Sequence, residues 1–200
     1  MVASRVASMK NTWLWLALAV CILGVNQESW AWTEGEIRES IEAILKVRHP
    51  NETRDWWRSL GAGTPRILIS MFKAESSIYH QIRLVDAMAW FDDPAVVEFL
   101  KDQAAHHENE SVRRAAIRSV GLSQGVKEKA FLKQSLESSD PHARLVAAKL
   151  LRDFKNPAAD QIVNEHLKTE KANWVSTGIR QHGLRRGNKL VIEGKRESSR

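Results

Sequence analysis

Residues 109–120, NESVRRAAIRSV, decide the fold, because a related stretch returns 31 residues later as DPHARLVAAKLL at residues 140–151. A period of this length is typical of stacked helical units, each burying its apolar face against its neighbours. The chain is therefore predicted to be an all-α solenoid of stacked helical hairpins.

Small and apolar residues recur in both stretches with the spacing of one buried helix face. In the first stretch they are Val112, Ala115, Ala116, Ser119 and Val120, and in the second Ala143, Val146, Ala147, Leu150 and Leu151. Small residues let a neighbouring helix approach closely, while the larger ones fill the remaining volume.

A second helix is predicted after each of these helices. Asp93-Pro94 and Asn156-Pro157 combine an N-cap with proline at the first helical position, as Asp140-Pro141 does. A further helix is expected over residues 126–136, and Gly121 and Gly125 are expected in the preceding loop.

One core position is expected to repeat at Leu100, Phe131 and Ile162, which are each one period apart. At the C-terminal end, residues 172–181 look like the start of a last unit. There Trp174 takes the position of Val112, and Val175 takes that of Arg113.

Less regular units are expected upstream, at residues 82–90 and at residues 54–61 with 65–73. Residues 36–47 read as a separate amphipathic helix that caps the N-terminal end. Trp56 and Trp57 cannot share one helix face, so one of them is expected in the core and an exposed one would be a binding candidate.

The repeats resemble HEAT repeats, specifically the short ones first associated with phycobilisome lyases. That pattern has an Asp, a Val-Arg pair, two alanines and a Leu-Gly; residues 111–121 match it apart from Ser111 and Val120. The resemblance implies about four to five HEAT-like units over residues 51–181, preceded by a capping helix within residues 32–50.

The N-terminus is predicted to be a secretory signal peptide, residues 1–31. Arg5 and Lys10 precede an apolar run at residues 12–25, and cleavage is expected after Ala31. The protein is accordingly expected to be periplasmic or secreted. An uncleaved membrane anchor and a lipoprotein attached through Cys21 remain alternatives.

The positive charge is concentrated at the other end. The chain has a net charge of +6. Seven basic and two acidic residues follow Ile179. Residues 182–200 are predicted to be a flexible basic tail, with binding to a polyanion or membrane surface as one possible role.

Arg83, Arg113 and Arg144 occupy matching positions, and the resemblance implies a structural ladder between arginines and acidic residues of adjacent units. Asp86 and Asp140 are the expected acidic partners. Asp86 falls on the buried stripe, so its carboxylate must be paired or protonated, or else belong to a functional pocket.

The outward positions of the repeated helices form the candidate partner-binding surface on the expected concave face. They are Arg114, Ile117, Arg118, Leu145, Lys149 and Arg152. A basic stripe with apolar residues between the charges suits an acidic protein or peptide. The alternative is an ordinary solvated helix face.

No catalytic, cofactor or metal motif is found. The adjacent His106 and His107 either diverge on a helix or lie in the loop before Asn109, and the chain contains no HExxH and no GxSxG. The sequence thus favours an exported, non-enzymatic interaction scaffold without cofactors. The alternative is an enzyme-accessory, lyase-like subunit. No nucleic-acid partner is expected, membrane contact is limited to the tail, and the oligomeric state is left open.

Overall fold

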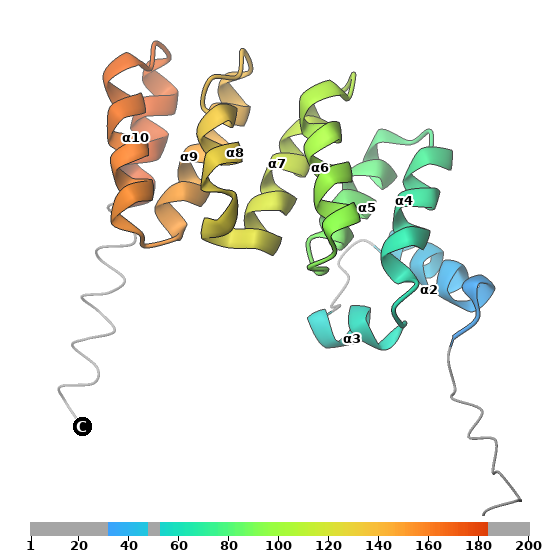
Figure 1. Cartoon of the computed structure of the whole chain (residues 1–200). Helices are drawn as coiled ribbons and strands as arrows, with labels where there is room; N and C mark the ends of the chain where they lie inside the picture. Colours follow the sequence, from blue (N-terminus) through green and yellow to red (C-terminus); the bar gives the residue numbers. More distant parts are fainter. Residues whose placement is uncertain (1–31, 48–52, 184–200) are drawn as a thin grey trace, which may run out of the picture. The chain divides into compact units, whose positions relative to one another are not determined.

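A computed structural model describes residues 32–47 and 53–183 (Figure 1). These residues belong to one compact unit, Trp32–Arg200. The proposed signal peptide and nearly all of the basic tail lie outside the described residues. Within them, all regular structure is helical: α2 Glu34–Lys46, α3 Arg54–Ser59, α4 Thr64–Ala74, α5 Ile78–Met88, α6 Pro94–His106, α7 Glu110–Gln124, the 3₁₀ turn η1 Gly125–Glu128, α8 Lys129–Ser135, α9 Pro141–Asp153, α10 Pro157–Thr169 and a last helix at 173–183.

The helix starts follow the predicted chemistry. The side chains of Asp93, Asp140 and Asn156 each accept a backbone N–H of the first turn, and each is followed by proline at the first position of its helix. Asn109 caps α7 in the same way, without a proline. Replacing such an N-cap residue by Ala typically costs about 1 kcal/mol of stability. The four capped starts therefore help to fix where the repeated helices begin.

The helices form two layers. In one layer α5 packs against α7 and α7 against α9; in the other, α4, α6, α8 and α10 each pack against a helix of the first layer (Figure 1). This confirms the predicted all-α solenoid of helical hairpins.

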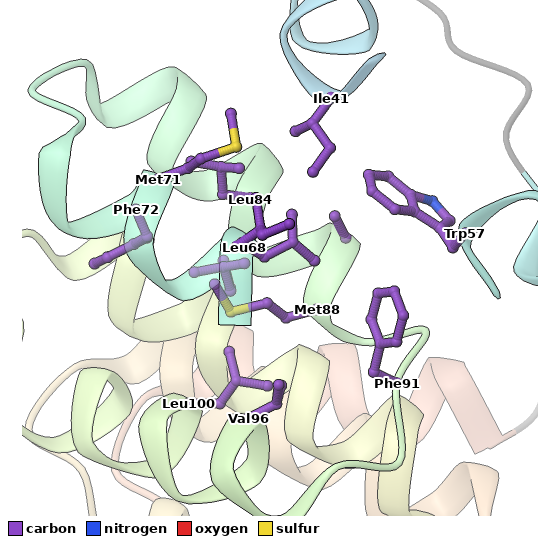
Figure 2. Packing of buried hydrophobic residues seen from close by; sticks show 14 of the residues in the cluster. Ile41, Trp57, Leu68, Met71, Phe72, Leu84, Met88, Phe91, Val96 and Leu100 are labelled. Carbon is purple, nitrogen blue, oxygen red and sulfur yellow. The ribbon is translucent and has the colours of Figure 1, made fainter. Parts of the chain in front are cut away.

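Two hydrophobic clusters make up the core, and α7 contributes to both. The first combines bulky side chains from α2 to α7, including Trp57, Phe72 and Met88 (Figure 2). The second centres on the alanines of α9, with Ala147 and Ala148 fully buried. Of the two tryptophans in α3, Trp57 is buried and Trp56 packs half-buried against it.

Gly121 is not a loop residue as predicted. It lies inside α7 and is buried, and a Cβ there would come within 2.8 Å of Leu150 Cδ1. Its role is close approach between α7 and α9. Helix α7 ends just before Gly125, whose φ is 58°. The helix predicted over residues 126–136 forms as the 3₁₀ turn η1 followed by α8.

The exact period also fails at two core positions. Leu100 is fully buried, but Phe131 and Ile162 are half-buried, and the residues after them, Leu132 and Val163, take the core position. Entry into α8 through a tighter 3₁₀ turn accounts for the slip at Phe131, because such a turn changes the rotation per residue.

The same slip occurs in the last helix. Trp174, which aligns with the buried Val112, is 46% exposed, and the adjacent Val175 is fully buried. The corresponding positions in α7 and α9 hold Val112 and Ala143, so an indole would overpack this site and the smaller valine turns inward instead.

Candidate functional site: a groove across α5, α7 and α9

A groove of about 300 Å³ crosses the layer formed by α5, α7 and α9. Its lining comes from all three helices, so it runs along the stack and not along one helix. The lining residues, called the groove below, are Ile82, Ser111, Arg114, Ala115, Arg118, His142, Leu145, Val146 and Lys149.

The floor of the groove is apolar because each helix turns small or aliphatic side chains toward it. Ala115 is buried, while Ile82, Leu145 and Val146 are half-buried. Leu145 also packs toward Gly178 of the last helix, where a Cβ would lie 3.1 Å from Leu145 Cδ1. The floor therefore extends beyond α9.

Arg118 is the most accessible arginine of the groove. It donates from Nη2 to Oδ1 of Asp86 on α5, and its side chain is 48% exposed. Burial raises the pKa of the Asp86 carboxyl, and the hydrogen bond and charge of Arg118, with the charge of Arg83, only partly offset this effect. Asp86, expected on the buried stripe, is only half-buried, with 41% of its side chain exposed, and it is not among the groove residues.

Arg114 is less accessible, with 25% of its side chain exposed. It donates from Nη2 to Ser111 Oγ at 2.9 Å, and its Nη1 lies 3.4 Å from Asp140 Oδ2. Asp140 is buried and also caps α9 through His142 N. This ion pair joins α7 to the start of α9, so Arg114 already faces an acid of the protein itself.

Lys149 completes the set of cations. It is half-buried on α9, exactly one period after Arg118, and within the described ranges it has no ionic partner. Arg118 and Lys149 are consequently the two cations best placed to meet an incoming anion.

Exposed hydrophobic side chains border the groove. The Trp174 ring lies 4.7 Å from the ring of His142, which is a groove residue. Tyr79 precedes Ile82 by three residues on α5, and Leu122 follows Arg118 by four residues on α7, so each shares the helix stripe of a groove residue. Tyr79 and Leu122 are the most exposed large hydrophobics among the described residues.

The structure thus brings together four of the six predicted partner-binding residues: Arg114, Arg118, Leu145 and Lys149. Ile117 does not belong with them. It is 3% exposed, because α7 is contacted by α5, α6, α8 and α9 and has less free surface than a simple two-layer picture allows.

Arg152 is also turned away from the groove. Its Nη1 donates to Asp160 Oδ1 at 2.9 Å and its Nη2 to Asn164 Oδ1 at 2.6 Å, both on α10. Its position in the last turn of α9 directs it toward the second helix of its own hairpin.

The matching arginines bind backbone carbonyls. Arg113 Nη1 donates to His107 O and Glu108 O, at 2.6 and 2.9 Å. Arg144 Nη1 donates in the same way to Ser138 O and Ser139 O, at 2.9 and 3.2 Å. Each arginine thereby fastens the loop before its own helix.

Arg83 departs from this arrangement, since it reaches Leu45 O, at 2.9 Å, and Val47 O at the end of α2. The acidic residues Asp86 and Asp140 also pair with other arginines than expected. Asp86 bonds Arg118 and Asp140 lies against Arg114, so both acids pair with groove arginines rather than with the matching series.

Glu170, which the sequence did not single out, is the acidic partner of Arg144. Its fully buried carboxylate accepts from Arg144 Nε and Nη2, both at 2.8 Å, and from Ala172 N at 2.8 Å. His166 Nε2 lies 2.9 Å away. These bonds, led by those of Arg144, lower the pKa of Glu170 to about 2.

Two other clefts are lined by fewer cations than the groove. One of about 320 Å³ lies among α2, α4 and α5, and one of about 540 Å³ among α6, α7 and α8. In the second, Lys101 is already paired with Glu98 and Glu128, and Arg113 with loop carbonyls. The first cleft does border an exposed aromatic ring, since Tyr79 lies 5.7 Å from the ring of its lining residue His80, but its lining also carries the acids Glu42 and Glu75.

Over residues 32–47 and 53–183, no group of His, Cys, Asp and Glu side chains could hold a metal ion. In the same part of the chain, no helix combines the length and the hydrophobicity needed to cross a membrane.

The fold places this protein in the class of all-α solenoids, and its groove is a surface of the kind that binds other proteins. The family model of HEAT repeats matches residues 65–140, from α4 to the N-cap of α9, so this part of the chain carries HEAT-like repeats. No curated protein and no solved structure was found to match the chain. Beyond the matched residues, Arg144 continues the loop-fastening arrangement of Arg113.

Proposed function

We propose that this protein is an exported, non-enzymatic scaffold that binds a segment of another protein in the groove across α5, α7 and α9. One observation carries the proposal: an apolar floor, accessible cations and an exposed indole meet in one groove that runs along the stack. HEAT repeats generally mediate protein–protein interaction. Export is proposed from the signal-peptide pattern of residues 1–31.

The residue types around the groove are those that dominate protein interfaces. Aromatic side chains and arginine are enriched at binding hot spots, and exposed apolar groups gain most when a partner removes them from water. Trp174, Tyr79 and Leu122 leave much of their surface in solvent in the free protein. A groove of this volume accommodates a few side chains, so the bound element is a peptide segment and not a folded domain.

The proposal is tested by capturing partners from the native extracytoplasmic fraction with residues 32–200 as bait. Trp174→Ala is compared with Trp32→Ala, because both indoles are 46% exposed and only Trp174 contacts a groove residue. We expect Trp174→Ala to weaken binding of the captured protein about 5–20-fold, which corresponds to a typical hot-spot cost above 1 kcal/mol. Trp32→Ala should bind like the wild type.

A bait ending at Gly183 separates the groove from the tail and keeps the last helix intact through the buried Ile179. Retention of the partner by this bait supports binding in the groove. Loss of the partner, together with equal binding by both tryptophan variants, contradicts the proposal and favours the basic tail.

A further inference from the structure

We infer that the groove recognises an extended acidic peptide, with two carboxylates about three residues apart and an apolar residue between them. The inference rests on the proposed function and names the chemistry of its partner. It is argued from the charges of the groove, the spacing of its helices and the position of its apolar floor.

The charges of the groove are positive where they are accessible. The two acids that face the groove arginines are Asp86 and Asp140. Asp140 is buried at the N-cap of α9, and Asp86, 41% exposed, is bonded to Arg118 and does not line the groove. Arg118 keeps half of its side chain in solvent although it is paired, and Lys149 has no ionic partner in the part of the chain that the structure describes. A carboxylate that enters the groove therefore meets cations and no exposed acid among the groove residues.

Repeat geometry fixes the distance between these cations. Arg118 and Lys149 occupy matching positions on α7 and α9, which are packed neighbours. Packed helix axes are about 8–10 Å apart. An extended polyproline-type segment rises about 3.1 Å per residue and repeats its face every three residues, so residues i and i+3 lie about 9 Å apart on one side. Such a segment running along the groove can place one carboxylate on each cation.

The apolar floor fits the residues between the carboxylates. Ala115 of α7 and Val146 of α9 lie on the groove floor, and Leu145 continues it toward the last helix. A small or aliphatic side chain of the peptide can cover this floor, while the ring of Trp174 beside His142 offers a face to a further apolar or proline residue. A basic peptide of the same apolar pattern would meet like charge at Arg118 and Lys149.

The test is selection of a random twelve-residue peptide display library on residues 32–200, followed by binding measurements with the enriched synthetic peptide. The key variant is Lys149→Glu. Lys133→Glu on α8 is the matched control, because it makes the same change of charge at an exposed lysine outside the groove. Thermal unfolding by circular dichroism verifies that both variants fold.

We expect enriched peptides to carry Asp or Glu pairs at i and i+3, and to bind more weakly as salt rises. Lys149→Glu should weaken binding at least tenfold, and Lys133→Glu less than twofold. Enriched peptides without acidic residues, no enrichment at all, or equal binding by the two lysine variants would overturn the inference. If neutral or basic peptides are selected and Trp174→Ala abolishes their binding, the acidic partner is wrong while the groove remains the binding site.

Discussion

Asp86 and Glu170 each face an arginine of the solenoid, yet their carboxyl groups respond in opposite directions. The pKa of Asp86 is raised, mainly because burial disfavours its charged form, although Arg118 bonds it. The pKa of Glu170 is lowered to about 2, although its side chain is fully buried. Both pairs link neighbouring helical units, so the type of pair does not explain the difference.

The number of hydrogen bonds explains it. Glu170 accepts two from Arg144 in a bidentate arrangement and one from the backbone N–H of Ala172, and it also lies against His166. Within the described residues Asp86 accepts a side-chain hydrogen bond from Arg118 alone, and 41% of the Asp86 side chain and 48% of the Arg118 side chain are exposed. A buried carboxylate is stabilised only when several donors replace its water, and a single exposed arginine does not suffice.

This difference separates a structural pair from a functional one. The Arg144–Glu170 pair closes the C-terminal end of the solenoid, since it ties α9 to the junction between α10 and the last helix. The Asp86–Arg118 pair leaves Arg118 about half exposed at the groove. The first is built to persist, while the second can share its arginine with a partner.

The largest expected effect comes from Glu170→Gln. Removing the charge leaves the guanidinium of Arg144, 16% exposed, without its anion, and breaking a buried pair of this kind costs about 3 kcal/mol. Thermal unfolding should show a fall in Tm of roughly 6–12 °C for a domain of this size. Hydrogen exchange should show the helix at 173–183 losing protection first.

Glu165→Gln, in α10 just before Glu170, is the matched control. Glu165 pairs with Lys168 at 3.0 Å, but both side chains are largely exposed, so the change should cost less than about 1 kcal/mol. Equal destabilisation by the two substitutions would contradict the structural role of Glu170.

The next effect is a dependence of stability on pH that originates at Glu170. Because its pKa is lower in the folded protein than in the unfolded chain, its contribution is complete above about pH 4.5 and is lost as pH falls toward 2. The shift from 4.5 to about 2 corresponds to about 3 kcal/mol. Denaturant unfolding of wild type and Glu170→Gln at several pH values should therefore converge at about pH 2; curves that stay parallel would refute this origin.

The sequence predicted the fold well because helix caps and the buried stripe obey local rules. Local residue types predicted the caps at Asp93, Asp140 and Asn156. The repeat spacing predicted the apolar face of α7 and the α-solenoid. Gly121 shows the limit of such rules. Its role depends on the distance to Leu150 of another helix, which no local pattern contains.

The groove was harder to predict for the same reason. Spacing placed Ile117 on the outward face, but contacts from four other helices bury it. Val175 is buried where the repeat period would place Trp174, because the volume of the core site, and not the period, decides which side chain fits. Glu170 is the C-cap of α10, outside every repeated helix, and no local pattern links it to Arg144, 26 residues earlier.

The smallest effect is expected from Asp86→Asn, and its sign sharpens the comparison with Glu170. Since the pKa of Asp86 is raised in the folded protein, its ionisation opposes folding as pH rises above the ordinary aspartate range. The amide removes this penalty and also weakens the half-exposed bond to Arg118, so stability at pH 7 should change by less than about 1 kcal/mol. Relative to wild type, the variant should gain stability as pH rises from about 3 to 7, opposite to Glu170→Gln. Denaturant unfolding over this range decides the question, because a loss of several kcal/mol at pH 7 would show that Asp86 is as structural as Glu170.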